Sequence, residues 1–349
     1  MLKRIAKTLL LVAGLDACSA AFSGEPTMTS PLLSKTRPWC IGRFVFDRPA
    51  ASEISNQRYE FRGEKLETQY NVPVATYQAK VEAREKELRT RKRIDPGNRN
   101  RETSHFWLEK ALSPIKDSRV FVYQDSATEG VSLPFDSEGF IYENGMVFHT
   151  VGGFGSTGLN KVDDFYNNLY HRIKARDNWS VPVESGFCFD GGIVTGSSTY
   201  PEEVSQSFAL MPEHRPALLL IQMRDSVSQD RDPAASLLKT LPDLRAKLDA
   251  IDAPYRILRQ GHRKIAGMDA EEVLFEVRDG GVTEYRFSLL APGDPSTLAK
   301  PHTSIQMILG DVSGRDMPAE ERTAPVDEAG ALQAWDTFLN SLRLRPGAV

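Results

Sequence analysis

The chain has 349 residues, of which 40% are apolar and 26% are charged. This length is too great for one ordinary hydrophobic core and fits two domains of about 150 residues each. The formal net charge is -4. It argues against a nucleic-acid partner, because phosphate binding requires a concentrated basic face.

The first residues have the pattern of an export signal. A basic start precedes the apolar run 9–15, which is too short to span a bilayer. The basic residues are Lys3, Arg4 and Lys7. We therefore predict that residues 1–24 hold the signal and the start of a tether, and that residues 25–37 are tether.

Cys18 ends the segment Leu15-Asp16-Ala17-Cys18, which is similar to a bacterial lipobox. In a lipobox the cysteine thiol takes a diacylglycerol and becomes the new N-terminus. The charged Asp16 departs from the small uncharged residue that is usual there. Two alternatives follow for an exported, periplasmic protein. One is lipidation at Cys18 with anchoring to the outer membrane, and the other is a plain cleaved signal, cut near Ala20 or Ala21.

The first half predicts strands, two-residue turns and amphipathic helices in alternation. Asn144-Gly145 has the composition of a two-residue hairpin turn. Apolar residues at three- and four-residue steps predict a helix from Val162 to about Arg176. In chain order we expect strands at 40–47 and 59–62, a helix at 73–93, a short helix at 106–112, a strand at 120–123, a hairpin at 139–149 and this helix.

The second half repeats that order. The run 217–223 is continuously apolar and predicts a central strand that is covered on both faces. Asp279-Gly280-Gly281 predicts a tight hairpin turn. We expect strands at 187–194, 217–223, 273–277, 284–289 and 303–309, and helices at 234–251 and 327–342.

Two short segments mark the start of each half. Segments 39–47 and 185–194 each carry one cysteine, a nearby glycine and a Phe-Asp pair. We interpret them as the opening strands of two copies of one duplicated unit. Since hairpins form antiparallel sheets, the predicted fold class is α+β: two similar domains, 38–180 and 183–345, each a mainly antiparallel sheet packed with helices.

Cys40 and Cys188 lie in these two segments and form a disulfide candidate. In an oxidising compartment a bridge between them would close a loop of about 150 residues and staple the two modules together. The alternative is two buried free thiols that act as small apolar side chains.

No catalytic, cofactor-binding or metal-binding set emerges from the motifs. Residues 153–158 match G-x-G-x-x-G, but the strand before them belongs to a hairpin, whereas a dinucleotide site needs a parallel βαβ unit. The six histidines are far apart in sequence, and the pairs Asp163-Asp164 and Glu271-Glu272 point in different directions as neighbours. We expect no enzyme activity, cofactor or metal.

The two opening segments resemble a known family. Cys40-x-Gly42-Arg43-Phe44 with Phe46-Asp47 is similar to the N-terminal signature of type VI secretion lipase immunity proteins, Tle-cognate immunity family 4. Gly186-Phe187-Cys188-Phe189-Asp190-Gly191 is similar to the start of that family's C-terminal domain, and 266–273 to a later segment of it. The resemblance covers about residues 38 to 343.

The resemblance implies a non-catalytic periplasmic protein that binds and neutralises a cognate secreted phospholipase or lipase, gripping it as a two-domain clamp. It identifies no contact residue, so the residues that bind the partner stay unknown. No nucleic acid is expected, and a membrane is expected only through the N-terminal lipid. The alternatives are an envelope lipoprotein that binds a small ligand or scaffolds other proteins, and an envelope enzyme with a perturbed titratable group in a polar cleft.

Overall fold

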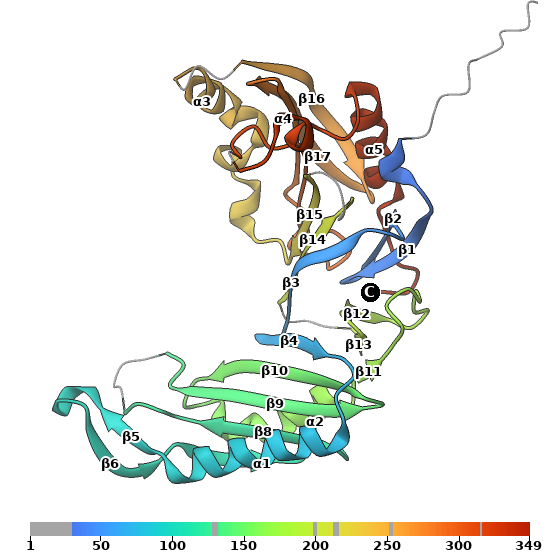
Figure 1. Ribbon diagram of the computed structural model, residues 1–349. Helices are drawn as coiled ribbons and strands as arrows, with labels where there is room; N and C mark the ends of the chain where they lie inside the picture. Colours follow the sequence, from blue (N-terminus) through green and yellow to red (C-terminus); the bar gives the residue numbers. More distant parts are fainter. Residues whose placement is uncertain (1–29, 128–131, 198–200, 212–215, 251–253, 315) are drawn as a thin grey trace, which may run out of the picture.

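The structure is a computed structural model that describes residues 30–127, 132–197, 201–211, 216–250, 254–314 and 316–349. The predicted export signal and Cys18 lie outside the described residues. Within them, helices pack on antiparallel sheets in two similar halves (Figure 1), which confirms the α+β class. None of the helices described in these ranges has the length and apolar character to cross a membrane.

One antiparallel sheet of twelve strands runs through both halves of the described chain. The first half supplies β3 (Glu53–Phe61), β4 (Glu64–Gln69), β7 (Leu108–Leu112), β8 (Ser118–Tyr123), β9 (Phe135–Glu143) and β10 (Met146–Phe154). The second supplies β14 (Glu202–Ala209), β15 (Ala217–Arg224), β16 (Tyr255–Ile265), β17 (Met268–Asp279), β18 (Val282–Ala291) and β19 (His302–Leu309). The order is β7-β8-β9-β10-β4-β3-β14-β15-β19-β18-β17-β16. It repeats outward from the β3–β14 pair, as expected of a duplicated unit.

Helices cover both faces of the sheet in each half. The helices are α1 (Val74–Thr90), α2 (Val162–Tyr170), α3 (Leu237–Ala250), α4 (Ala319–Arg322) and α5 (Glu328–Ser341), with 3-10 turns η1 (Pro31–Leu33), η2 (Pro96–Asn98), η3 (Leu159–Lys161), η4 (Ser228–Arg231) and η5 (Pro233–Ala235). Along β8, Phe121 packs in the cluster under α1, whereas Val120 and Val122 pack in the main core with α2. This alternation follows from the two-residue period of a strand.

Two three-stranded sheets exchange strands between the halves. They consist of β1 (Thr36–Ile41), β2 (Phe44–Pro49) and β20 (Arg343–Leu344), and of β12 (Gly186–Phe189), β13 (Gly192–Thr195) and β11 (Ile173–Ala175). The hairpin β1–β2 opens the first half but pairs with β20, which follows the last helix of the second half. The hairpin β12–β13 opens the second half and pairs with β11, which follows α2 of the first. Each half is therefore completed by the other.

Both opening segments differ from the single strands expected of them. Each is a hairpin, because Gly42 (φ 55°) and Gly191 (φ 69°) adopt left-handed backbone that turns the chain back on itself. The predicted turns at Asn144-Gly145 and Gly280-Gly281 are confirmed, with positive φ at all four residues.

The short helix expected at 106–112 is wrong. Residues Leu108–Leu112 form the edge strand β7, which pairs with β8. Apolar Leu108 and Leu112 are four residues apart, a spacing that fits a helix and a strand equally well. The ends of two helices also differ: α1 stops at Thr90, before a two-stranded sheet of β5 (Lys92–Asp95) and β6 (Arg101–Phe106), and α2 stops at Tyr170, so that Ile173 starts β11.

The predicted tether, residues 25–37, is described only from Ser30. From there the chain packs on the fold: the Leu32 side chain is fully buried, and the Ser30 amide donates to the Gln333 side chain of α5 at 2.8 Å. The described part of this segment is thus attached to the second half.

Candidate functional site

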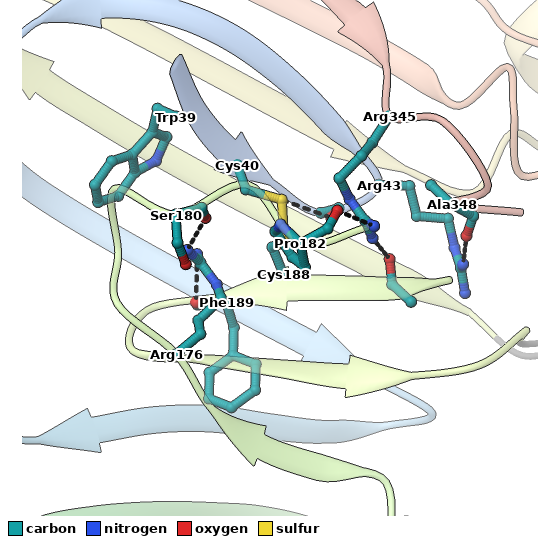
Figure 2. Close-up of a disulfide and its surroundings, with 12 residues drawn as sticks. Trp39, Cys40, Arg43, Arg176, Ser180, Pro182, Cys188, Phe189, Arg345 and Ala348 are labelled. Atoms are coloured by element: carbon teal, nitrogen blue, oxygen red, sulfur yellow. Dashed lines mark hydrogen bonds between the residues drawn. A yellow bond between two sulfur atoms is a disulfide. The ribbon is translucent and has the colours of Figure 1, made fainter. Parts of the chain in front are cut away.

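The junction of the two halves is built around Cys40 and Cys188, which form a disulfide with an S–S distance of 2.07 Å and a Cα–Cα distance of 6.0 Å. Both cysteines are buried. Beside the bridge, the Gly42 amide donates to the Cys188 carbonyl at 3.1 Å, and the Cys188 amide donates to the Gly42 carbonyl at 2.7 Å. The two opening hairpins are thereby linked covalently by the disulfide (Figure 2) and also by backbone hydrogen bonds.

Two arginines at equivalent places tie the connecting segment 176–185 to the junction. Arg176 follows β11 and donates to the Phe189 carbonyl at 3.1 Å, and Arg345 follows β20 and donates to the Pro182 carbonyl at 2.9 Å (Figure 2). Burial lowers the pKa of Arg345 to about 10, with further contributions from the positive charges of Arg43 and Arg176. These guanidinium groups satisfy backbone carbonyls that an irregular segment would otherwise leave unpaired.

Arg43 and Glu202 form a buried ion pair at the same junction. The guanidinium donates to the two carboxylate oxygens at 2.7 and 2.6 Å, and the side chains are 2% and 6% exposed. Arg43 also donates to the Ala348 carbonyl (Figure 2). Burial raises the pKa of Glu202, while the hydrogen bonds from Arg43 act in the opposite direction. The pair joins the first hairpin to β14 and to the C-terminal residues.

Trp179 of the connecting segment completes this packing. Its ring lies edge-on to Trp39 at 5.1 Å. The Arg48 guanidinium lies over both rings, at 4.0 Å from the Trp39 centroid and 4.6 Å from that of Trp179. The junction thus joins the two halves through a disulfide, a buried ion pair and packed aromatic rings.

The glycine-rich segment 153–158 leads from β10 to α2. Its strand β10 lies between antiparallel neighbours β4 and β9, so the parallel unit of a dinucleotide site is not formed there. Phe154 packs edge-on against Phe165 of α2 at 5.4 Å. The segment connects hairpin and helix.

Glu271 and Glu272, one of the two acidic pairs, have separate structural roles. Glu271 accepts from the Ser236 hydroxyl at 2.8 Å and from the Leu238 amide at 3.1 Å, at the start of α3. Glu272 faces the other side, where it accepts from Trp335 at 3.0 Å. Across the described ranges, no group of three or more His, Cys, Asp or Glu side chains is arranged to hold a metal ion.

Two neighbouring cavities open on the second half. One of about 280 Å³ lies between η5 and β17, next to His262 and Lys239. A neighbouring one of about 390 Å³ shares Arg231 and Asp269 with it. The carboxylate of Glu271, which lines the first, is already engaged by Ser236.

Glu64 is the carboxyl with the clearest perturbation, and its setting is structural. It starts β4, is 2% exposed, and accepts from the Tyr166 hydroxyl at 3.0 Å and the Ser137 hydroxyl at 3.3 Å. Burial raises its pKa to about 7. Gly152 permits this burial, because a Cβ there would lie 2.0 Å from the carboxylate. Glu64 lines neither of the cavities above.

Glu64→Gln is expected to stabilise the fold at pH 8 by about 3 kcal/mol. A folded-state pKa of about 7 exceeds the unfolded value, so the contribution of Glu64 is fully favourable below about pH 4.5 and is lost as the pH rises to about 7. Urea unfolding at pH 5 and pH 8 measures it. Glu67→Gln, on the same strand with a lowered pKa, is the control. A variant no more stable than the parent at pH 8 contradicts the assignment.

Both halves match models of one family. Residues 37–155 match the Tle cognate immunity protein 4 N-terminal domain, and residues 180–347 match the Tle cognate immunity protein 4 C-terminal domain. The chain belongs to the Tle cognate immunity protein 4 family. Both cysteines of the disulfide lie within the matched regions, one in each.

Solved structures agree with this family fold. The apo structure of the immunity protein TplEi of the type VI secretion system from Pseudomonas aeruginosa is similar with a TM-score of 0.74 at 21% identity, over 90% of this chain and 98% of that one. A chain of the Tle4-Tli4 complex has the same TM-score and identity, over 89% and 98%. No curated protein matches the chain in sequence.

Sequence reasoning predicted Cys40 and Cys188 as a pair but missed the arginines around them. Arg43 stands in the resemblance motif without a role, and only the fold brings Glu202 to it. Arg176 and Arg345 each directly follow the short strand that comes after the last helix of a half, β11 and β20. These two strands are too short to be recognised in the sequence, so nothing there pointed to the pair.

Proposed function

We propose that the protein is a non-catalytic immunity protein that binds and neutralises a cognate type VI secreted lipase. The observation that carries the proposal is the match of both halves to the two domains of the Tle cognate immunity protein 4 family. The similarity to a chain of the Tle4-Tli4 complex over 98% of that chain supports a protein partner. The structural roles of the buried carboxylates described above support a role without catalysis.

A two-domain clamp is the binding mode that the junction supports. The disulfide, the Arg43–Glu202 pair and the continuous β3–β14 pairing fix the two halves relative to each other. Because its two halves are already joined, the immunity protein would lose little conformational entropy when it closes on a partner, and this favours tight binding.

The periplasm is the compartment that we propose. The basic and apolar start of the sequence supports export, and the Cys40–Cys188 bridge suits an oxidising environment. Anchoring to the outer membrane through Cys18 is the further proposal. Labelling with a radioactive fatty acid tests it: label in the wild type and none in Cys18→Ala is the expected result.

The purified chain is expected to inhibit the type VI lipase encoded beside its own gene at one-to-one stoichiometry, because a clamp engages one partner. Phospholipid hydrolysis is measured as the chain is titrated in. In cells that carry the lipase in the periplasm, co-expression of the full chain is expected to restore growth. Co-expression of a chain without residues 1–24 is not expected to restore it. Undiminished hydrolysis at excess of the chain would refute the proposed function.

A further inference from the structure

Residues 91–106, which contain the two-stranded sheet β5–β6, project from the first half at the end away from the junction (Figure 1). We call this segment the arm. None of its residues is buried, and it forms no part of the twelve-stranded sheet. The arm therefore adds nothing to the hydrophobic core, which sets it apart from the other hairpins of the fold.

The arm is nevertheless held in one conformation. The Arg93 guanidinium donates to the Phe106 carbonyl at 2.9 Å and to the Gln124 side chain at 2.7 Å, and pairs with Glu109. The Ile94 amide donates to the Asp125 carbonyl at 3.1 Å. These bonds order the arm before any partner arrives, and this lowers the entropy that its binding would lose.

The surface of the arm combines apolar and cationic groups. Ile94 and Phe106 are 39% and 48% exposed. Arg99 and Arg101 are exposed near the tip, and neither forms an ion pair with the described residues. Burying an exposed Phe side chain against a partner removes apolar surface from water, and an unpaired Arg can form two parallel hydrogen bonds to a carboxylate. Phe and Arg are both enriched in protein interfaces for these reasons.

The arm belongs to the first half alone. It makes up most of the connection between α1 and β7, residues 91–107, whereas the equivalent connection between α3 and β16 spans only residues 251–254. Two copies of one unit thus differ by an exposed, ordered insertion. Since the fold of the second half is complete without it, the arm is not needed for folding.

We propose that the arm is a docking element for an acidic surface of the lipase, with Phe106 entering an apolar recess and Arg99 and Arg101 pairing with carboxylates. This rests on the proposed function. A lipid surface is the weaker occupant, because electrostatic membrane sites use about four to eight cations. The arm offers fewer: Arg93 is paired with Glu109, Arg91 with Glu87, and Lys92 lies near Glu102.

The test uses the full chain and the type VI lipase encoded beside its gene, with Kd measured by calorimetry. Arg99→Glu with Arg101→Glu, and separately Phe106→Ser, are each expected to raise Kd about 30-fold or more, as hot-spot residues do. The charge reversal is also expected to weaken the salt dependence of the association rate. Melting temperatures are expected to stay at the parent value, because the replaced side chains are exposed.

The matched control reverses two exposed cations elsewhere. Lys35 precedes β1, and Lys116 lies at the far end of the β7–β8 hairpin from the arm; Lys35→Glu with Lys116→Glu is expected to change Kd less than threefold. Parent-like Kd in both arm variants overturns the inference while the proposed function stands. No binding by the parent chain overturns both. If the arm variants lose binding to phosphatidylglycerol vesicles but keep the parent Kd for the lipase, the arm is a membrane element and the inference is wrong.

Discussion

Replacing Cys40 and Cys188 by alanine is expected to lower the free energy of unfolding by about 5 kcal/mol. The two cysteines are 148 residues apart in sequence. In the loop-entropy model, closing a loop of that length removes about 5 kcal/mol of conformational freedom from the unfolded chain. Urea unfolding under oxidising conditions, followed by tryptophan fluorescence, measures the difference.

Single variants serve as controls for this prediction. Cys40→Ala and Cys188→Ala each open the same loop, so each is expected to lose about as much stability as the double variant. Their far-ultraviolet circular dichroism is expected to match the parent, because β3 and β14 still pair across the junction. A double variant within about 1 kcal/mol of the parent would contradict the entropic role of the bridge.

Arg43→Met is expected to lower the free energy of unfolding by about 3–5 kcal/mol at pH 8, because it leaves the Glu202 carboxylate buried without its cation. The Glu202 side chain is only 6% exposed, and its pKa is already raised by burial. Loss of Arg43 removes the hydrogen bonds that oppose this rise. The loss in free energy of unfolding is therefore expected to be smaller at pH 5, where Glu202 of the variant takes up a proton.

A double-mutant cycle with Glu202→Leu separates the pair from other effects of Arg43. Arg43→Met with Glu202→Leu is expected to be more stable than Arg43→Met alone, since no uncompensated charge remains in the core. If the double variant is as unstable as the sum of the two single variants, the two side chains do not act as a pair. The hydrogen bond from Arg43 to Ala348 would then be the more important contact.

The local elements that follow strict patterns could be read from the sequence. Asn144-Gly145 predicts its turn because few other residue pairs tolerate positive φ at both positions. The continuous apolar run of β15 predicts a central strand, and β15 lies between β14 and β19. Segments 39–47 and 185–194 resemble one family, and both domain matches confirm that family.

The exchange of strands could not be predicted in the same way. β20 and β11 are too short to show a period, and nothing in the sequence of Arg343–Leu344 indicates β2 as its neighbour. The pairing of β3 with β14 joins segments about 150 residues apart, and such long-range register is set by packing of the whole core. Of the arm, only residues 91–93 are expected from the sequence to belong to the helix 73–93, because their cations suit a helix C-terminus.

The exchanged strands have a consequence for how the chain unfolds. Each half supplies the strand that closes the opening hairpin of the other, and β3 and β14 share one sheet. When one half unfolds, the other loses a strand from its hairpin and gains an open sheet edge. We therefore expect the two halves to unfold together, in a single transition.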